Sequence, residues 1–280
     1  MTMKNRQISP MIVLLALPVL LAGCIGQTFD SLGSVNPFKS ADPVLAGERR
    51  PVSPTAIDDP AKGSPAIGAA VASSDWTQAG GNARNAPGHV SLSGGNGASV
   101  WRARGVVESG RKAIRSAAPP IVYGGRVFVY SGNGPVSSLS SGGGKQWSGS
   151  LRPEGEKSSI GSGGIAASGN AVFAATGYGE LTALGASNGA RLWTYDLDAP
   201  ARTAPAVADG RIYVVTVANV LHSVNIEDGS QAWTAPGVGE VAGVLSAASP
   251  AVSGNRVVVP FSSGEIAAFD TKTGELKWVD

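Results

Sequence analysis

Residues 249–278, SPAVSGNRVVVPFSSGEIAAFDTKTGELKW, form one complete unit of a repeat. The unit starts with a proline and small residues, and glycines at 254, 264 and 274 separate short runs of β-branched or apolar residues. The last of these runs ends in Trp278. Short apolar runs bounded by glycine turns predict β-strands joined by tight hairpins. Repeats of this length determine the architecture of a chain, and copies of this unit recur upstream of it.

Five tryptophans set the register of the repeat. Each has a glycine four residues upstream, and successive tryptophans lie 40 to 46 residues apart. Four antiparallel strands at this interval are typical of a β-propeller blade. We therefore predict an all-β fold, a β-propeller of four-stranded antiparallel blades. The tryptophans are Trp101, Trp147, Trp193, Trp233 and Trp278, and the glycines of the last four are Gly143, Gly189, Gly229 and Gly274.

Four units of the repeat are complete, at residues 118–149, 163–196, 203–235 and 248–280. The segment around Trp101 matches only the final strand of a unit, so we expect it to form one N-terminal closing strand. In each unit the glycine supplies a tight bend, and the tryptophan is expected to pack on the neighbouring blade. Asp270 can accept hydrogen bonds from the amides of its turn. These residues are expected to be structural, and the blades would occupy residues 99–280.

The N-terminus predicts export and lipidation. Lys4 and Arg6 precede an apolar stretch at 11–21, which has the length of a signal peptide and is short for a membrane span. It ends in Leu-Ala-Gly followed by Cys24, which resembles a bacterial lipobox. We expect residues 1–23 to be a lipoprotein signal peptide and Cys24 to be lipidated. The alternative is an ordinary secretory signal with an incidental cysteine. Since Ile25 follows the cysteine where inner-membrane lipoproteins often carry aspartate, the outer membrane is favoured.

Residues 24–74 are rich in Ser, Pro, Ala and Gly and predict a flexible tether, and 75–98 form a lead-in segment to the blades.

The composition excludes several classes of function. No basic patch supports nucleic-acid binding. The two histidines, His89 and His222, lie far apart in sequence and have no ligand cluster around them, so we expect no metal site and no catalytic residue. With Cys24 spent on lipid, no disulfide is expected.

The repeat, the lipobox and the segments LAGER (45–49) and DWTQAGGNARNAPGH (75–89) carry a family resemblance. The chain resembles the PQQ-type β-propeller repeat family and, within it, the BamB-like lipoproteins of the β-barrel assembly machinery. The resemblance implies an eight-bladed propeller that faces the periplasm, is not an enzyme and holds no cofactor. It also implies binding to BamA and the rest of the β-barrel assembly complex, with unfolded outer membrane proteins as further clients.

This sequence departs from the family in showing four blades rather than eight. Three explanations stay open: a truncated or split product, half of a ring completed by another chain, and a small self-closed ring. We expect the first. The family's contact loop joins the last strand of one blade to the first strand of the next, and the best-placed segment here is 236–247. Its apolar residues Val241, Val244 and Leu245 suit a partner contact, although packing under the blade is an equal alternative.

Two other functions are compatible with a propeller fold and compete with the assembly role. A quinoprotein dehydrogenase would need a bound quinone, a calcium ion with oxygen ligands and a catalytic carboxylate. The acidic residues of this chain are scattered and it has no cysteine pair, so we expect no enzyme. A propeller lipoprotein serving another envelope complex is the second rival, because propellers are general binding platforms.

Overall fold

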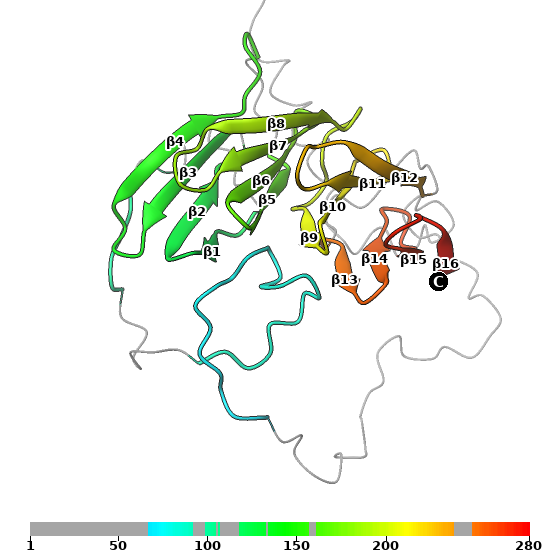
Figure 1. The fold of residues 1–280 in the computed structure, drawn as a ribbon, viewed down its shortest axis with the longest axis horizontal. Coiled ribbons are helices and arrows are strands. Elements are labelled where there is room, and N and C mark those ends of the chain that lie inside the picture. Colours follow the sequence, from blue (N-terminus) through cyan, green and yellow to red (C-terminus); the bar gives the residue numbers. More distant parts are fainter. Residues whose placement is uncertain are drawn as a thin grey trace, which may run out of the picture. The chain divides into compact units, whose positions relative to one another are not determined.

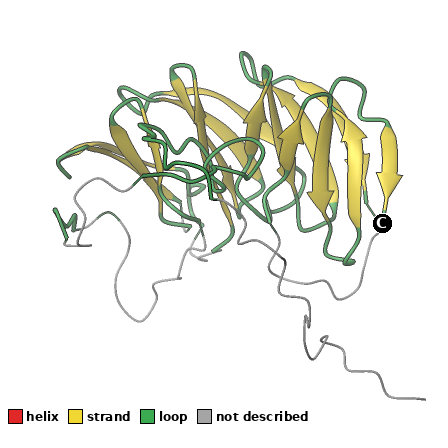
Figure 2. Cartoon of the chain, turned by 90° about the horizontal axis from the view of Figure 1, so that it is seen from below, coloured by secondary structure: helices red, strands yellow, loops and turns green. Residues whose placement is uncertain are grey.

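The computed structural model describes residues 67–91, 99–104, 106, 118–132, 134–156, 161–237 and 248–280. All of them belong to one compact unit, Ala66–Asp280. The described residues contain sixteen strands and no helix, and the strands succeed one another around the molecule in Figures 1 and 2. The predicted all-β fold is therefore confirmed.

The strands form four separate four-stranded antiparallel sheets, each built from consecutive strands. The first blade contains β1 (Ile121–Tyr123), β2 (Arg126–Tyr130), β3 (Pro135–Ser140) and β4 (Lys145–Ser150). The second contains β5 (Gly163–Ser168), β6 (Ala171–Thr176), β7 (Glu180–Gly185) and β8 (Arg191–Asp196). The third contains β9 (Ala206–Ala208), β10 (Arg211–Val215), β11 (Val220–Asn225) and β12 (Gln231–Pro236). The fourth contains β13 (Ala251–Ser253), β14 (Arg256–Pro260), β15 (Ile266–Asp270) and β16 (Leu276–Val279).

The four blades lie beside one another in chain order. Their first strands, β1, β5, β9 and β13, contact one another in succession, as Figure 1 shows for the inner edges of the sheets. Each sheet therefore runs outward from an inner strand to an outer one that carries a repeat tryptophan. This is the meander of a propeller blade.

Apolar side chains at the junctions between successive blades form the core. One cluster joins the first and second blades around Phe128 and Val172, a second joins the second and third around Phe173 and Ile212, and a third joins the third and fourth around Tyr213. Each fully buried large side chain contributes about 1.5–3 kcal/mol. A single sheet has no such cluster within itself, so each blade is stable mainly through its neighbours.

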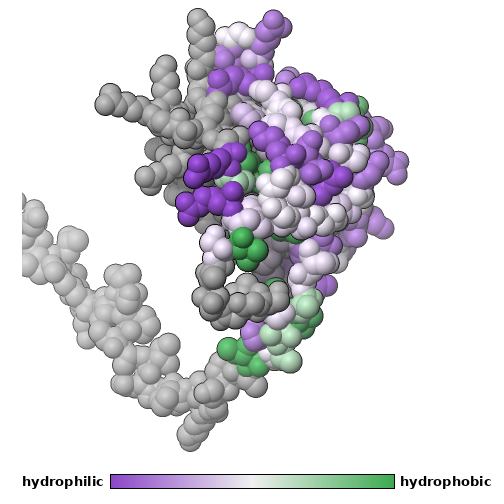
Figure 3. Space-filling model, turned by 90° about the vertical axis from the view of Figure 1, so that its left-hand side faces the viewer, coloured by the Kyte–Doolittle hydropathy of each residue, from purple (hydrophilic) through white to green (hydrophobic). Residues whose placement is uncertain are grey.

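On the side of the molecule seen in Figure 3, hydrophilic residues predominate and apolar residues appear in small separate patches.

Residues 99–104, where we expected a closing strand, form no strand. A strand needs a ladder partner for its backbone groups, and none of the described strands pairs with this segment. The tryptophan of this segment, Trp101, nevertheless packs against Gly143 of the first blade.

Candidate partner-binding surface

Each repeat glycine lies against the tryptophan of the preceding blade. A side-chain carbon added at Gly189 would lie 2.6 Å from Cε3 of Trp147, and one added at Gly229 would lie 2.6 Å from Cε3 of Trp193. The third junction repeats this contact between Gly274 and Trp233, and Gly143 holds the ring of Trp101 in the same way. These glycines also have φ between 72° and 85°, a region that favours glycine. Only glycine satisfies both requirements.

The indole N–H completes each junction. Trp147 Nε1 donates to the Ala186 carbonyl at 3.0 Å, Trp193 Nε1 to that of Ile226 at 3.2 Å, and Trp233 Nε1 to that of Thr271 at 3.1 Å. A buried indole usually finds such an acceptor. Opposite each tryptophan on the adjacent strand stands a small residue, and a register shift follows it. These small residues are Ser138, Ala183, Ser223 and Ala268.

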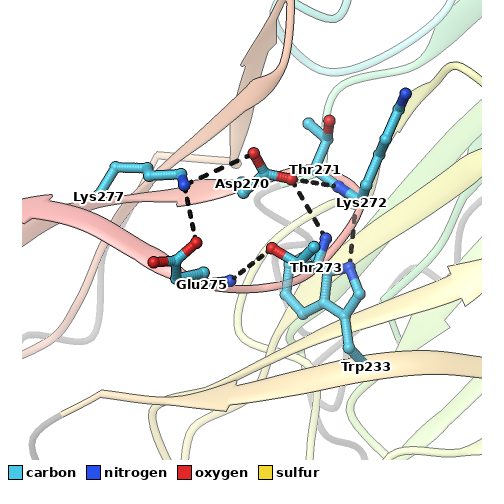
Figure 4. Close-up of polar contacts among 7 residues, drawn as sticks. All are labelled: Trp233, Asp270, Thr271, Lys272, Thr273, Glu275 and Lys277. Carbon is cyan, nitrogen blue, oxygen red and sulfur yellow. Dashed lines mark hydrogen bonds and ion pairs between the residues drawn. The ribbon is translucent and has the colours of Figure 1, made fainter.

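Figure 4 shows the turn that receives Trp233. Asp270 Oδ1 accepts hydrogen bonds from the amides of Lys272 at 2.9 Å and Thr273 at 3.2 Å. These two donors hold the pKa of the Asp270 carboxyl below its usual value, and the nearby charge of Lys277 adds to the effect. Lys277 Nζ lies 2.8 Å from Glu275 Oε2 and 3.8 Å from Asp270 Oδ2. The polar groups of this site therefore bond to one another and stabilise the turn.

The second and third blades brace the same turn with a different residue. Asn188 Oδ1 accepts from the Ala190 amide at 3.0 Å, and Asp228 Oδ1 accepts from the Ser230 amide at 2.9 Å. Both residues stand directly before the repeat glycine. An Asn or Asp before glycine is a recognised turn signal, so the sequence indicates these turns, but it does not show that Asn188 and Asp228 take the role of Asp270.

The lead-in segment contains a strap, residues 76–85, that bonds to the innermost strand of every blade. The Trp76 carbonyl accepts from the Val122 amide at 2.9 Å, and the Thr77 carbonyl accepts from the Ala167 amide at 2.8 Å. Gln78 Oε1 accepts from the Val207 amide at 2.9 Å, and the Ala83 carbonyl accepts from the Val252 amide at 2.6 Å. The four amides occupy the same register position of their blades. One short segment therefore provides a hydrogen-bond acceptor for the equivalent inner-strand amide of each of the four blades.

Side chains strengthen the strap. Gln78 is buried and also donates through Nε2 to the Val207 carbonyl at 3.0 Å. Asn85 Nδ2 donates to the Ser249 carbonyl at 2.9 Å. Trp76 forms a two-way antiparallel bridge with Val122. The sequence offered no periodic signal for these contacts, because the strap bonds through irregular backbone and through single side chains.

A cavity of about 400 Å³ opens where the strap meets the loops that lead into the inner strands. Its lining includes Asn85, Ser162, Arg202 and Ser249. Arg202 Nη2 donates to Asn219 Oδ1 at 2.5 Å, and burial lowers the pKa of the Arg202 guanidinium. Among the described residues no carboxylate forms an ion pair with this guanidinium, and its Nη1 has no hydrogen-bond partner. The cavity is therefore lined mainly by small apolar residues, and the guanidinium of Arg202 is the one charged group among its described lining residues.

The two histidines lie apart and form no site together. His89 is exposed, and its Nδ1 lies 2.8 Å from the Gly68 carbonyl. His222 Nδ1 lies 3.1 Å from the Tyr195 hydroxyl, which donates to Gln231 Oε1 at 2.7 Å. Since that hydroxyl has one proton, Nδ1 of His222 is the donor of the pair. Burial lowers the pKa of His222, partly offset by the charges of Asp198 and Asp196.

Several expectations concern residues outside the described ranges. Cys24 and the whole segment 1–65 are among them, as are Val241, Val244 and Leu245 in the loop between β12 and β13. Within the described ranges, no three His, Cys, Asp or Glu side chains gather closely enough to hold a metal ion. In that same part of the chain, no helix has the length and hydrophobicity needed to cross a bilayer.

Comparisons with known proteins bear on the whole arrangement. Residues 132–280 match the model of a family described as outer membrane protein assembly factor BamB. The BamB of Yersinia pestis is 28% identical over 185 residues, which cover 64% of this chain and 47% of that protein. The BamB of Moranella endobia is 26% identical over 166 residues, covering 57% of this chain and 42% of that protein. The chain thus spans about half the length of the curated relatives it matches.

Solved structures agree on the fold. The crystal structure of BamB from Moraxella catarrhalis superposes with a TM-score of 0.50 at 22% identity, covering 60% of this chain and 49% of that one. The quinohemoprotein alcohol dehydrogenase of Comamonas testosteroni gives a TM-score of 0.55 at 17% identity, covering 75% of this chain and 41% of that one. Both likenesses concern the propeller fold alone. The match from β3 to the last strand extends over more than half of the sequence, so the chain belongs to the BamB family of outer membrane protein assembly factors.

Proposed function

We propose that this protein is a non-enzymatic scaffold of the β-barrel assembly machinery that binds BamA and aids the folding and insertion of outer membrane β-barrel proteins. The observation that carries the proposal is the family match across residues 132–280, which spans three complete blades and the last two strands of the first. The arrangement of the described residues suits a platform, because its polar groups hold turns and junctions together and its loops surround an open cavity.

The decisive experiment is capture of the lipidated full chain from outer membrane extracts. We expect BamA and other members of the β-barrel assembly complex among the captured proteins. Recovery of a different envelope complex without BamA would contradict the proposal and favour a propeller lipoprotein of another assembly.

The anchor that we propose is a lipid on Cys24, which would hold the protein on the periplasmic face of the outer membrane. Its support is the order of a basic start, an apolar stretch and Leu-Ala-Gly-Cys in the sequence. Two or more acyl chains give lasting attachment at about 0.8 kcal/mol per buried methylene. Metabolic labelling with palmitate should mark the unaltered chain and leave the Cys24→Ser variant unlabelled. Equal labelling of both proteins would refute this anchor.

The contact that we propose lies in the loop between β12 and β13, with Val241, Val244 and Leu245 as its apolar residues. The loops at the same place in the other blades support this assignment, since residues of the β4–β5 and β8–β9 connections line the cavity described above. Leu245→Asp should reduce the recovery of BamA at least about tenfold, because a charge would have to be desolvated at the contact. Leu192→Asp, on the outer strand of the second blade, is the control, since Leu192 is 52% exposed.

A quinone-dependent enzyme is the alternative function, because the Comamonas dehydrogenase shares the fold, although the likeness extends only to the fold. The residues described here do not gather acidic or histidine ligands at one place. Titration calorimetry with pyrroloquinoline quinone and Ca²⁺ should give no binding heat. A dissociation constant in the micromolar range or below would overturn the non-enzymatic assignment.

A further inference from the structure

The cavity where the strap meets the blades has no ligand assigned to it by the proposed function. All four blades line it with residues just before their first strands, and the strap lines it with its own residues. Because the first strands gather at the inner edges of the sheets (Figure 1), the cavity lies where the four blades converge. Its volume of about 400 Å³ is within the range of roughly 300–1,000 Å³ that is usual for small-molecule sites. The blades contribute, among others, Pro119, Ser162, Thr203 and Ser249.

Two of the lining residues hold buried polar groups without partners. Arg202 is 9% exposed and its Nη1 makes no hydrogen bond, and the Oγ of Ser162 is also buried and makes none. The other four such atoms in the described part of the chain belong to strand residues, whereas these two lie in loops at the cavity. Buried polar groups normally find partners, so an exception needs a physical explanation. Two groups that can donate at one cavity indicate a place for a hydrogen-bond acceptor.

The guanidinium of Arg202 is held in position by neutral groups. Its Nη2 donates to Asn219 Oδ1 at 2.5 Å, and the same oxygen accepts from the Ser262 amide at 3.2 Å and from the Ser262 hydroxyl at 2.9 Å. Asn219 is 2% exposed and has a φ of 60° in the turn between β10 and β11. Since no carboxylate of the described residues pairs with Arg202, its charge is not compensated there. A buried charge without a counter-charge is costly and favours an anion beside it.

The other lining residues select the kind of anion. They are mostly small and apolar, and no second cationic side chain occurs among those that the structure describes. One guanidinium matches one carboxylate, because its planar N–H groups can bond to both oxygens. The apolar part of the lining suits a hydrocarbon body. A ligand with several carboxylates, such as the quinone considered above, would have charges removed from water without partners, which is unfavourable.

We propose that this cavity binds a small organic monocarboxylate. The carboxylate accepts hydrogen bonds from the guanidinium of Arg202 and the hydroxyl of Ser162, and the hydrocarbon part lies against the small residues of the strap and of the inner loops. Because Nη1 of Arg202 is closed to solvent in the empty cavity, a rotation about the outer bonds of the side chain accompanies binding. This inference does not rest on the proposed binding of BamA.

The test uses benzoate as the probe and the full chain in nonionic detergent micelles, with amide chemical shifts followed by NMR. We expect saturable shifts at the amides of Gly163 and Thr203, which line the cavity, with a dissociation constant on the order of 1 mM, an ordinary value for so small a ligand. Benzyl alcohol, a neutral molecule of similar shape, should bind at least about tenfold more weakly because it lacks the charge-assisted bonds.

Two outcomes with these probes would overturn the proposal. The first is the absence of saturable shifts at these amides with benzoate at about ten times the expected dissociation constant. The second is binding of inorganic phosphate as tight as that of benzoate, because the site would then take inorganic anions and its apolar lining would contribute nothing.

Variants test the two residues that bind the carboxylate. Arg202→Met removes the charge and keeps an apolar chain, so it should weaken benzoate at least about tenfold. Arg191→Met is the matched control, since Arg191 is exposed on β8 and does not line the cavity, and it should leave the affinity unchanged. Equal losses in these two variants would mean that benzoate responds only to the overall charge of the protein, and would overturn the site.

Ser162→Ala keeps the test decisive if Arg202→Met disturbs the fold through Asn219. The Oγ of Ser162 has no partner to lose, so thermal unfolding of this variant should match that of the unaltered chain. Its affinity for benzoate should fall about threefold, the effect of one hydrogen bond. An unchanged affinity would contradict the placing of the carboxylate beside Ser162 and Arg202.

Discussion

At the scale of single residues, the junctions depend on glycines that do two things at once. Gly229 adopts a φ of 73° and touches the ring of Trp193, whereas Gly210 in the same blade has a φ of 74° and open space around it. Comparing Gly229 with Gly210 therefore separates the effect of a positive φ, which both share, from the effect of close packing, which only Gly229 has. The repeat glycines are thus constrained by the neighbouring blade more than by their own turn.

We expect Gly229→Ala to lower the free energy of unfolding by about 2–4 kcal/mol, combining left-handed strain with overpacking against the indole. Gly210→Ala should cost only about 1–2 kcal/mol, because strain alone applies there. Urea unfolding followed by tryptophan fluorescence measures both changes. Equal losses in the two variants would show that the contact with Trp193 contributes nothing.

His222 gives stability a dependence on pH. Burial lowers its pKa in the folded state below the ordinary value of 6.5, so the unfolded chain binds the proton more readily. Stability is therefore greatest above about pH 6.5 and falls as the pH is lowered through the folded pKa. His222→Gln should remove this part of the slope when unfolding is measured between pH 5 and 8. A slope unchanged by the substitution would assign the effect to other groups.

At the scale of elements, the blades were predictable and the strap was not. Period-two runs, glycine turns and register-matched tryptophans indicate hairpins wherever they occur, because such structure is encoded locally. The strap is held by contacts to residues 46 to 169 positions away, such as Trp76 with Val122 and Ala83 with Val252. The strand expected at 99–104 did not form for a related reason, since a strand depends on a ladder partner and none of the described strands pairs with this segment.

The strap can be tested through Gln78. Gln78→Ala removes two hydrogen bonds to Val207 and leaves that residue's amide and carbonyl without partners near the inner edge of β9. We expect a loss of about 2–4 kcal/mol in the free energy of unfolding, because each buried group left unpaired costs about 1–3 kcal/mol. Thr77→Ala is the control, since Thr77 bonds to β5 through its backbone carbonyl. A comparable loss in the control would mean that the side-chain bonds of Gln78 are not what matters.

At the scale of the whole molecule, two kinds of coupling join the blades. The clusters between adjacent sheets connect only nearest neighbours, as in other repeat proteins. The strap connects all four blades to one segment of ten residues, so it couples blades that do not touch. Blades with nearest-neighbour contacts alone can unfold locally one at a time. Because the strap bonds to all four inner strands, its loss from one blade should also weaken its hydrogen bonds to the other three.

This coupling leads to a prediction for hydrogen exchange. Replacing residues 76–85 with a Gly-Ser sequence of equal length should cut the protection of four amides together, those of Val122, Ala167, Val207 and Val252. Without the side chains of the strap, its backbone carbonyls are no longer held against the inner strands. Amides within the sheet ladders, such as that of Phe173 in β6, should keep most of their protection and report on the blades themselves. Exchange measured by NMR on the full chain in micelles distinguishes the outcomes. If only the Val122 amide lost protection, the strap would belong to the first blade alone, and the remaining blades would be held solely by their tryptophan junctions.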